Sequence, residues 1–156
     1  MAPAVIPWEL VEACRLPELE VEEGSAFGDQ QAELLRTQFL VRSGPGLYQL
    51  HPLVRQFLRL QSQGQLEVMS CWRKQLAAAV ARVCRERIPQ TLTLEQIQAL
   101  EVFLPHIQTV AEHLADDVGE EDLLWPILGL ARVAEHQAAF GEALKWYQLG
   151  ACRTFS

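Results

Sequence analysis

The residues that could carry chemistry in this chain are four histidines, four cysteines and one short glycine-flanked run. The run, Gly24–Gly28, has the glycines of a phosphate-binding loop but lacks the lysine that contacts the phosphates. It also fails as the nucleophile turn of a hydrolase, because alanine occupies the place of the serine. No Gly-x-x-x-x-Gly-Lys-Ser/Thr motif occurs elsewhere in the chain. The sequence therefore predicts a protein that is not an enzyme and has no cofactor of its own.

Metal binding is also not indicated by the spacing of the histidines and cysteines. His106 and His113 lie seven positions apart, on roughly one face of an expected helix, but no third ligand accompanies them. We interpret both as polar or half-buried helix residues and predict no metal site. The cysteines contain no Cys-x-x-Cys pair, and we expect buried thiols rather than disulfides or zinc ligands. The four are Cys14, Cys71, Cys84 and Cys152.

The charge balance favours a protein partner over nucleic acid. Thirteen basic against twenty acidic side chains give a net charge of −7, and no third of the chain is basic. The hydrophobic fraction of 49% and the length of 156 residues are those of an ordinary globular domain. Neither a signal peptide nor a stretch of about 20 apolar residues occurs, so we expect a cytoplasmic protein without a membrane span.

The first sixty residues predict helix, helix, hairpin and a closing helix. Pro7 opens the first helix, and Asp29 is the expected N-cap of the second. Strand-like runs then flank Gly44–Gly46, whose Pro45 and Gly46 suit a type II turn. Pro52 begins the closing helix directly after His51. The apolar residues of that helix are expected on its buried side: Leu53, Phe57 and Leu60.

The run from Leu50 to Arg59 (Leu-His-Pro-Leu-Val-Arg-Gln-Phe-Leu-Arg) resembles the winged-helix module of the STAND, or NB-ARC-type, signal-transduction ATPases. In that family a histidine opens the last helix of the module. The resemblance implies that His51 matches the family's nucleotide sensor, which contacts the β-phosphate of bound ADP. The residues themselves also allow a second interpretation, in which His51 only caps its helix and joins the core of the small domain.

The rest of the chain is predicted to be helical. A stripe from Met69 through Trp72 and Leu76 to Val83 marks the buried face of a helix over 66–88. Thr93 and Gln96 form a capping box for the next helix, and Pro105 starts another. The acidic run 116–122 is expected to be a solvated linker.

The last residues resemble a tetratricopeptide repeat (TPR), a pair of antiparallel helices. The spacing Phe140-x-x-Ala143-x-x-x-Tyr147 is similar to the second helix of that repeat, with Ala138 in place of the usual turn glycine and Gly150 in place of an alanine. The region from Phe103 to Tyr147 also resembles the arm that joins the winged helix to the repeats in bacterial STAND ATPases. Such arrays need about three units, so a single unit leaves its outer face uncovered.

These observations predict a mainly α fold, with a small winged-helix-like α+β unit followed by TPR-like antiparallel helix pairs. The expected divisions are 1–62 for the winged helix, 63–122 for a helical arm and 123–156 for one incomplete repeat. The predicted function is a non-enzymatic protein–protein interaction or regulatory module, acting on a protein partner or by self-association. The alternative is a winged-helix DNA-binding regulator. The expected interaction surface consists of Leu144, Tyr147, Ala151 and Phe155.

Overall fold

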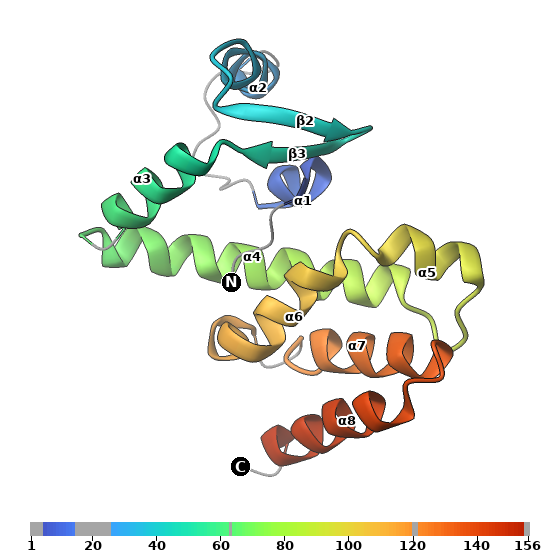
Figure 1. Cartoon of the computed structure of the whole chain (residues 1–156). Helices are drawn as coiled ribbons and strands as arrows, with labels where there is room; N and C mark the ends of the chain where they lie inside the picture. The colour runs from blue at the N-terminus through green and yellow to red at the C-terminus, as the bar shows by residue number, and fades with distance from the viewer. Residues whose placement is uncertain (1–4, 15–25, 63, 120–121, 155–156) are drawn as a thin grey trace. The chain divides into compact units, whose positions relative to one another are not determined.

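The computed structural model describes residues 5–14, 26–62, 64–119 and 122–154. Within these ranges the chain is mainly helical, with eight α-helices, a short 3-10 helix and a three-stranded antiparallel sheet (Figure 1). This confirms the predicted fold class at that coarse level. The chain divides into two compact units, Pro3–Gln75 and Leu76–Ser156 together with Met1–Ala2. The finer division at residues 62 and 122 stays a prediction.

The amino-terminal unit is built on the sheet. Its elements are β1 (Ile6–Pro7), α1 (Trp8–Ala13), α2 (Ala26–Arg36), β2 (Leu40–Gly44), β3 (Leu47–Leu50) and α3 (Pro52–Ser62). The strand order is β1-β3-β2, so β3 is central and β2 is an edge strand. Strand β1 was not predicted, because a strand of two residues is too short to show a periodic pattern. It pairs Ile6 with Tyr48, and the Trp8 ring meets the Tyr48 ring edge-on at 5.4 Å.

The hairpin between β2 and β3 forms where the sequence predicts it. Gly46 has a φ of 66°, as the third residue of a type II turn requires. The register pairs Leu40 with Leu50, and it shifts between Arg42 and Gly44 just before the turn. The predicted turn residues therefore specify the hairpin.

Helix α2 corrects one prediction. It begins at Ala26, which places Asp29 in the first turn and not at the N-cap. The acidic side chain still lies at the positive end of the helix dipole, where a negative charge is favourable. The sequence also predicts a solvated loop over Glu18–Gly28, but residues 26–28 belong to α2, and residues 18–25 lie outside the described residues.

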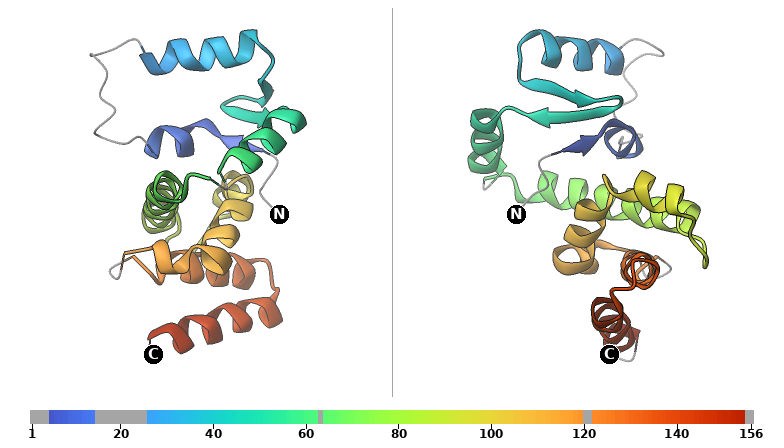
Figure 2. Two further views of the ribbon diagram at one scale, coloured as in Figure 1. Left: turned by 90° about the vertical axis from the view of Figure 1, so that its left-hand side faces the viewer. Right: turned by 45° about the vertical axis from the view of Figure 1, so that its right-hand side comes forward.

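The carboxy-terminal unit contains only helices. Its elements are the end of α4 (Leu66–Arg87), α5 (Leu94–Leu100), α6 (Leu104–His113), the 3-10 helix η2 (Ala115–Asp117), α7 (Trp125–His136) and α8 (Phe140–Thr154). Helix α7 packs most extensively against α8, which runs back along it, and it also packs against α6 (Figure 2). The core of this unit includes Val80, Cys84, Ile88, Ile107, Val110 and Ile127.

Two local motifs place these helices. The Thr93 side chain accepts a hydrogen bond from the backbone N–H of Gln96 at 3.3 Å, and the Gln96 side chain accepts one from the N–H of Thr93 at 2.8 Å. This confirms the predicted capping box. Helix α7 ends in a Schellman motif, in which the N–H of Ala139 bonds to the carbonyl of Ala134 and that of Ala138 to Glu135. Ala138 has a φ of 57°, a left-handed conformation that normally favours glycine.

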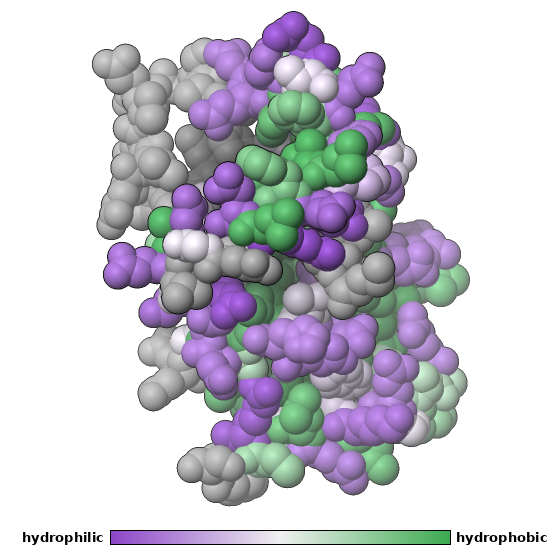
Figure 3. All heavy atoms as spheres, turned by 60° about the vertical axis from the view of Figure 1, so that its left-hand side comes forward, coloured by the Kyte–Doolittle hydropathy of each residue, from purple (hydrophilic) through white to green (hydrophobic). Residues whose placement is uncertain are grey.

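The predicted buried face of the closing helix is wrong. Leu53, Phe57 and Leu60 of α3 are 69%, 57% and 62% exposed, and no described side chain of α3 is buried. Hydrophobic side chains lie at the surface in this part of the molecule (Figure 3). The predicted burial of the apolar stripe along α4 is correct only in the second half of the helix, since Val80 and Val83 are buried whereas Trp72 is exposed. In α3 and in the first half of α4 the apolar spacing is that of a packed helix, but these apolar side chains are exposed.

Two further expectations need correction. The four cysteines are free thiols, but only Cys14 and Cys84 are buried, and Cys71 and Cys152 are exposed. Burial raises the pKa of the Cys84 thiol to about 12. The acidic run 116–122, expected to be a solvated linker, begins within the 3-10 helix η2 (Ala115–Asp117), and its Asp122 pairs with Arg85 at 3.0 Å.

Candidate functional site

His51 caps the first turn of α3. Its ring Nδ1 accepts a hydrogen bond from the backbone N–H of Leu53 at 3.3 Å, and its carbonyl accepts one from Arg55 at 3.0 Å. Because Pro52 has no N–H, the Leu53 amide is the first donor that this helix start can offer. The capping role expected from the residues is therefore observed. The expectation that His51 joins the core is wrong, because its side chain is exposed.

The role of His51 as a nucleotide sensor stays a prediction that follows from the family resemblance alone. The Leu53 amide that could meet a phosphate is occupied by the His51 ring. The backbone N–H of His51 donates to the Phe39 carbonyl at 2.9 Å, so it is occupied as well. A phosphate could bind the Leu53 amide only by displacing the His51 ring from it.

Helix α8 places the predicted interaction residues on one exposed stripe. Leu144 is 57% exposed, Tyr147 is 36% exposed and Ala151 is exposed, at spacings of three and four residues. Phe155 lies outside the described residues. Phe140, one turn earlier, is 69% exposed and extends the stripe. The TPR resemblance gives Phe140 a repeat position, and the predicted interaction surface did not include it.

The other side of α8 is buried against its neighbours. Ala143, Trp146 and Gly150 are buried, and a Cβ atom at Gly150 would lie 3.4 Å from Ile127 on α7. The small residues allow α7 and α8 to approach closely, as the large–small alternation predicts. The exposed stripe is therefore the outer face of a helix that is held firmly from the inside.

Tyr147 is fixed within this stripe by one polar contact. Its hydroxyl donates a hydrogen bond to Glu135 Oε2 on α7 at 2.8 Å. Partial burial raises the pKa of Tyr147, and the hydrogen bond and negative charge of Glu135 raise it further. The hydrogen bond holds the ring in one orientation, so its apolar face forms a defined part of the surface.

A groove lies beside α8 in the same unit. It has a volume of about 310 Å³ and is bordered by residues of α6, α7 and α8. Its polar lining consists of the carboxylates Glu101 and Glu142 and the amides Gln108 and Gln137, over an apolar floor that includes Trp146. The groove and the α8 stripe give the carboxy-terminal unit two adjoining surfaces that a polypeptide could contact.

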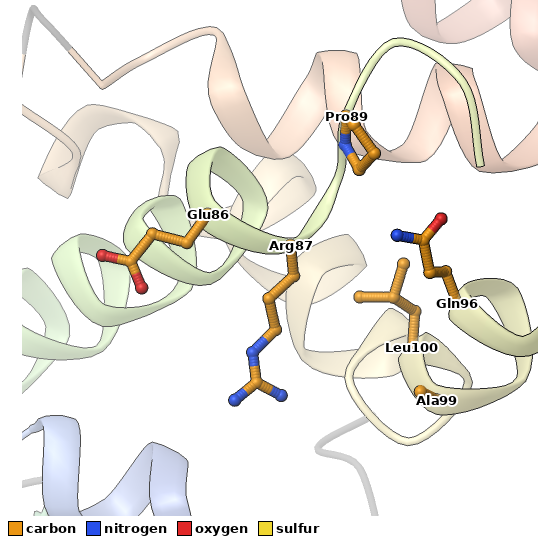
Figure 4. Close-up of a pocket in the computed structure, with 6 residues that line it drawn as sticks. All are labelled: Glu86, Arg87, Pro89, Gln96, Ala99 and Leu100. Atoms are coloured by element: carbon orange, nitrogen blue, oxygen red, sulfur yellow. The ribbon is translucent and has the colours of Figure 1, made fainter. Parts of the chain in front are cut away.

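A second hollow, of about 500 Å³, lies where α4 ends and α5 begins (Figure 4). Its polar groups do not converge. Glu86 points away from the rest, the Arg87 guanidinium lies 5.2 Å from the centre of the Phe103 ring, and Gln96 caps α5 (Figure 4). This hollow therefore offers no assembled acid–base pair.

The two histidines that were expected to be helix residues differ in their exposure to solvent. His106 is buried, whereas His113 is exposed and its Nε2 lies 3.7 Å from Glu112. Within the described ranges, no three histidine, cysteine or acidic side chains lie where they could share a metal ion. Across the same ranges, every helix is too short or too polar to cross a membrane.

Comparisons of the chain with protein-family models, with curated proteins and with solved structures gave no match.

Proposed function

We propose that this chain is a non-enzymatic, cytoplasmic protein–protein interaction module whose contact surface is the outer face of α8. The observation that carries the proposal is the stripe of Phe140, Leu144, Tyr147 and Ala151, exposed on a helix whose inner side is buried. A monomeric protein rarely leaves such a contiguous apolar surface uncovered, and helix pairs of the TPR type normally cover it with the next helix.

The proposal includes the resemblance to the segment between the nucleotide-binding domain and the repeats of STAND ATPases. Its support is the order of elements: two helices, a hairpin and a helix opened by His51, followed by helices that end in the antiparallel pair α7 and α8. The TPR-like character of that pair is supported by the tight Schellman turn at Ala138 and the close approach at Gly150. In this context the module would transmit a signal by contact and not by catalysis.

The test is the association state of the chain and of one α8 variant. We expect light scattering to show concentration-dependent association, and bis-ANS to bind the wild-type surface. Leu144→Gln removes an exposed apolar side chain from the stripe, so it should weaken both. Lys145→Gln, an exposed neighbour outside the stripe, is the matched control and should change neither. A monomer at every concentration, with bis-ANS binding unchanged in Leu144→Gln, contradicts the proposal.

The DNA-binding alternative has less support. The helix before the hairpin, α2, carries a single arginine, Arg36, and its Nη2 atom pairs with Glu33 at 2.6 Å. An arginine neutralised by its own helix contributes little to phosphate binding. A gel shift showing salt-sensitive micromolar binding would reverse this order of preference.

A further inference from the structure

Helix α3 of the amino-terminal unit is amphipathic but packs against nothing substantial in the described chain. Leu53, Phe57 and Leu60 follow one another at i, i+4 and i+7, the spacing of a buried helical face. All three are more than half exposed. Within the described part of its own unit, the helix makes no extensive contact with another helix or strand. We call the exposed side chains of Leu53, Phe57 and Leu60 the α3 face.

The exposure extends beyond α3 itself. Among the side chains described between His51 and Leu76, none is buried. Val68 and Trp72, in the first turns of α4, are 51% and 39% exposed. Hydrophobic side chains are visible at the surface around α3, among polar ones (Figure 3). An uncovered apolar surface of this kind marks an interaction site in a stable protein.

The charge around the α3 face indicates the sign of its partner. No aspartate or glutamate occurs between Glu33 and Glu67, although the whole chain has a net charge of −7. The same stretch contains four arginines, of which Arg36, Arg42 and Arg59 are exposed, and Arg36 pairs with Glu33. Arg59 belongs to α3 itself, on the polar side of the helix. This local excess of positive charge in the sequence around α3 favours a negatively charged partner.

We propose that the α3 face binds an acidic amphipathic helix of a partner protein. The side chains at i, i+4 and i+7 form an apolar ridge, and such a ridge can pack into the groove between the apolar side chains of a second helix. Arg59, on the same helix, then offers a positive charge to the acidic residues of that partner. This site is on a different unit from the α8 stripe, so it gives the protein a second and chemically distinct contact.

Two other kinds of partner fit less well. Nucleic acid would neutralise the arginines, but it offers no apolar surface to cover Leu53, Phe57 and Leu60. An anionic membrane would accept both the leucines and the arginines, yet it would repel the rest of a chain with a net charge of −7. An acidic helix contacts only the region around α3, so it meets less of that repulsion than an extended anionic surface does.

The test uses the full chain and synthetic peptides of defined chemistry. The probe is a fluorescein-labelled peptide of about 18 residues, long enough to form a helix, with leucines at helical spacing and glutamates elsewhere. One control peptide replaces each glutamate by lysine, and another scrambles the acidic sequence so that its apolar face is lost. Fluorescence anisotropy should show saturable binding of the acidic amphipathic peptide alone, and the binding should weaken as salt is added.

Variants of exposed residues assign the binding to the α3 face. Phe57→Gln should weaken the acidic peptide about tenfold, because one aromatic side chain is no longer buried in the complex. Arg59→Glu should weaken it about tenfold and improve binding of the lysine peptide, since the local charge is reversed. Leu144→Gln removes a comparable apolar side chain from α8 and should leave the peptide affinity unchanged. Thermal melts by circular dichroism check that the variants remain folded.

The results that would contradict the α3 proposal can be told apart from one another. Absence of acidic-peptide binding, or equal binding of the lysine or scrambled peptide, overturns the proposal. So does preferential binding to phosphatidylserine vesicles, which would make the face a lipid contact. Self-association that is lost in Phe57→Gln would make it an interface between copies. If Leu144→Gln weakens the peptide while Phe57→Gln does not, the peptide binds α8, and only the α8 proposal survives.

Discussion

The clearest test of packing in the carboxy-terminal unit compares two helical glycines, Gly129 on α7 and Gly150 on α8. A Cβ atom at Gly129 would lie 2.9 Å from Ile88 Cδ1 and 3.3 Å from Cys84 Sγ. At Gly150 the nearest atom would be Ile127 Cγ2 at 3.4 Å, an ordinary van der Waals contact. The two sites thus share the same helical backbone chemistry and differ in the space available.

The expected free energies follow from that difference. Replacing glycine by alanine inside a helix stabilises it by about 1 kcal/mol. We expect Gly150→Ala to retain most of this gain. At Gly129 the neighbours Ile88 and Cys84 are almost fully buried and cannot move aside freely, and overpacking costs about 1–3 kcal/mol. Gly129→Ala should therefore lower the free energy of unfolding by about 1 kcal/mol, so the two variants should differ by about 2 kcal/mol.

Urea unfolding followed by far-UV circular dichroism measures both variants against the wild type. Ile88→Val supplies the control, because it removes the methyl group that the new Cβ would meet. Alone it should cost about 1 kcal/mol, and in the Gly129→Ala background it should cost clearly less. Equal stabilisation by both alanines, or additive effects of Gly129→Ala and Ile88→Val, would refute the close approach of α7 to the end of α4.

Three further predictions concern single side chains. Ala138→Gly should raise the free energy of unfolding by about 0.5–1 kcal/mol in the same urea assay, because alanine at a φ of 57° is disfavoured; a decrease would contradict the Schellman turn. In native protein a thiol reagent such as DTNB should modify Cys71 and Cys152 quickly and Cys84 only after unfolding, and rapid modification of Cys84 would contradict its burial. Because the folded pKa of Tyr147 is raised, its contribution to stability should be complete below its ordinary pKa of 10.0 and lost as the pH rises through the raised value. Urea titrations should show this alkaline loss in the wild type and less of it in Tyr147→Phe.

Local features were predictable from the sequence because their causes lie within a few residues. The capping box needs only Thr93 and Gln96, and the hairpin needs only the turn chemistry of Pro45 and Gly46. Helix α4 was predicted over 66–88 and is observed over Leu66–Arg87, since a long periodic pattern ends at a proline. The start of α2 was predicted four positions too late, at Gln30 rather than Ala26, because a helix start depends on preceding residues as well as on the best capping side chain.

The candidate sites were predictable only in part. The exposed stripe of α8 was expected because a single repeat unit leaves its outer face uncovered. The environment of the cysteines was predicted only in part, because their spacing argues against disulfides and zinc but does not locate each thiol, and Cys71 and Cys152 are exposed. For His51, position before Pro52 was enough to predict a cap, whereas nucleotide sensing depends on the resemblance and stays a prediction.

The error at α3 has a physical cause that also separates the two proposed surfaces. Amphipathicity depends on the sequence of one helix alone, whereas burial depends on the helix and the element that packs against it. Periodic apolar residues therefore predict that a face will be covered, but they do not identify the element that covers it. Helix α7 has neighbours in α6 and α8 and is largely buried, and α8 has a neighbour on one side only. The exposed stripe of α8 is thus the outer face of the last described helix of this stack. Helix α3 has no buried side at all, so its apolar stripe is not the remainder of internal packing, and an external partner is the more direct explanation for it.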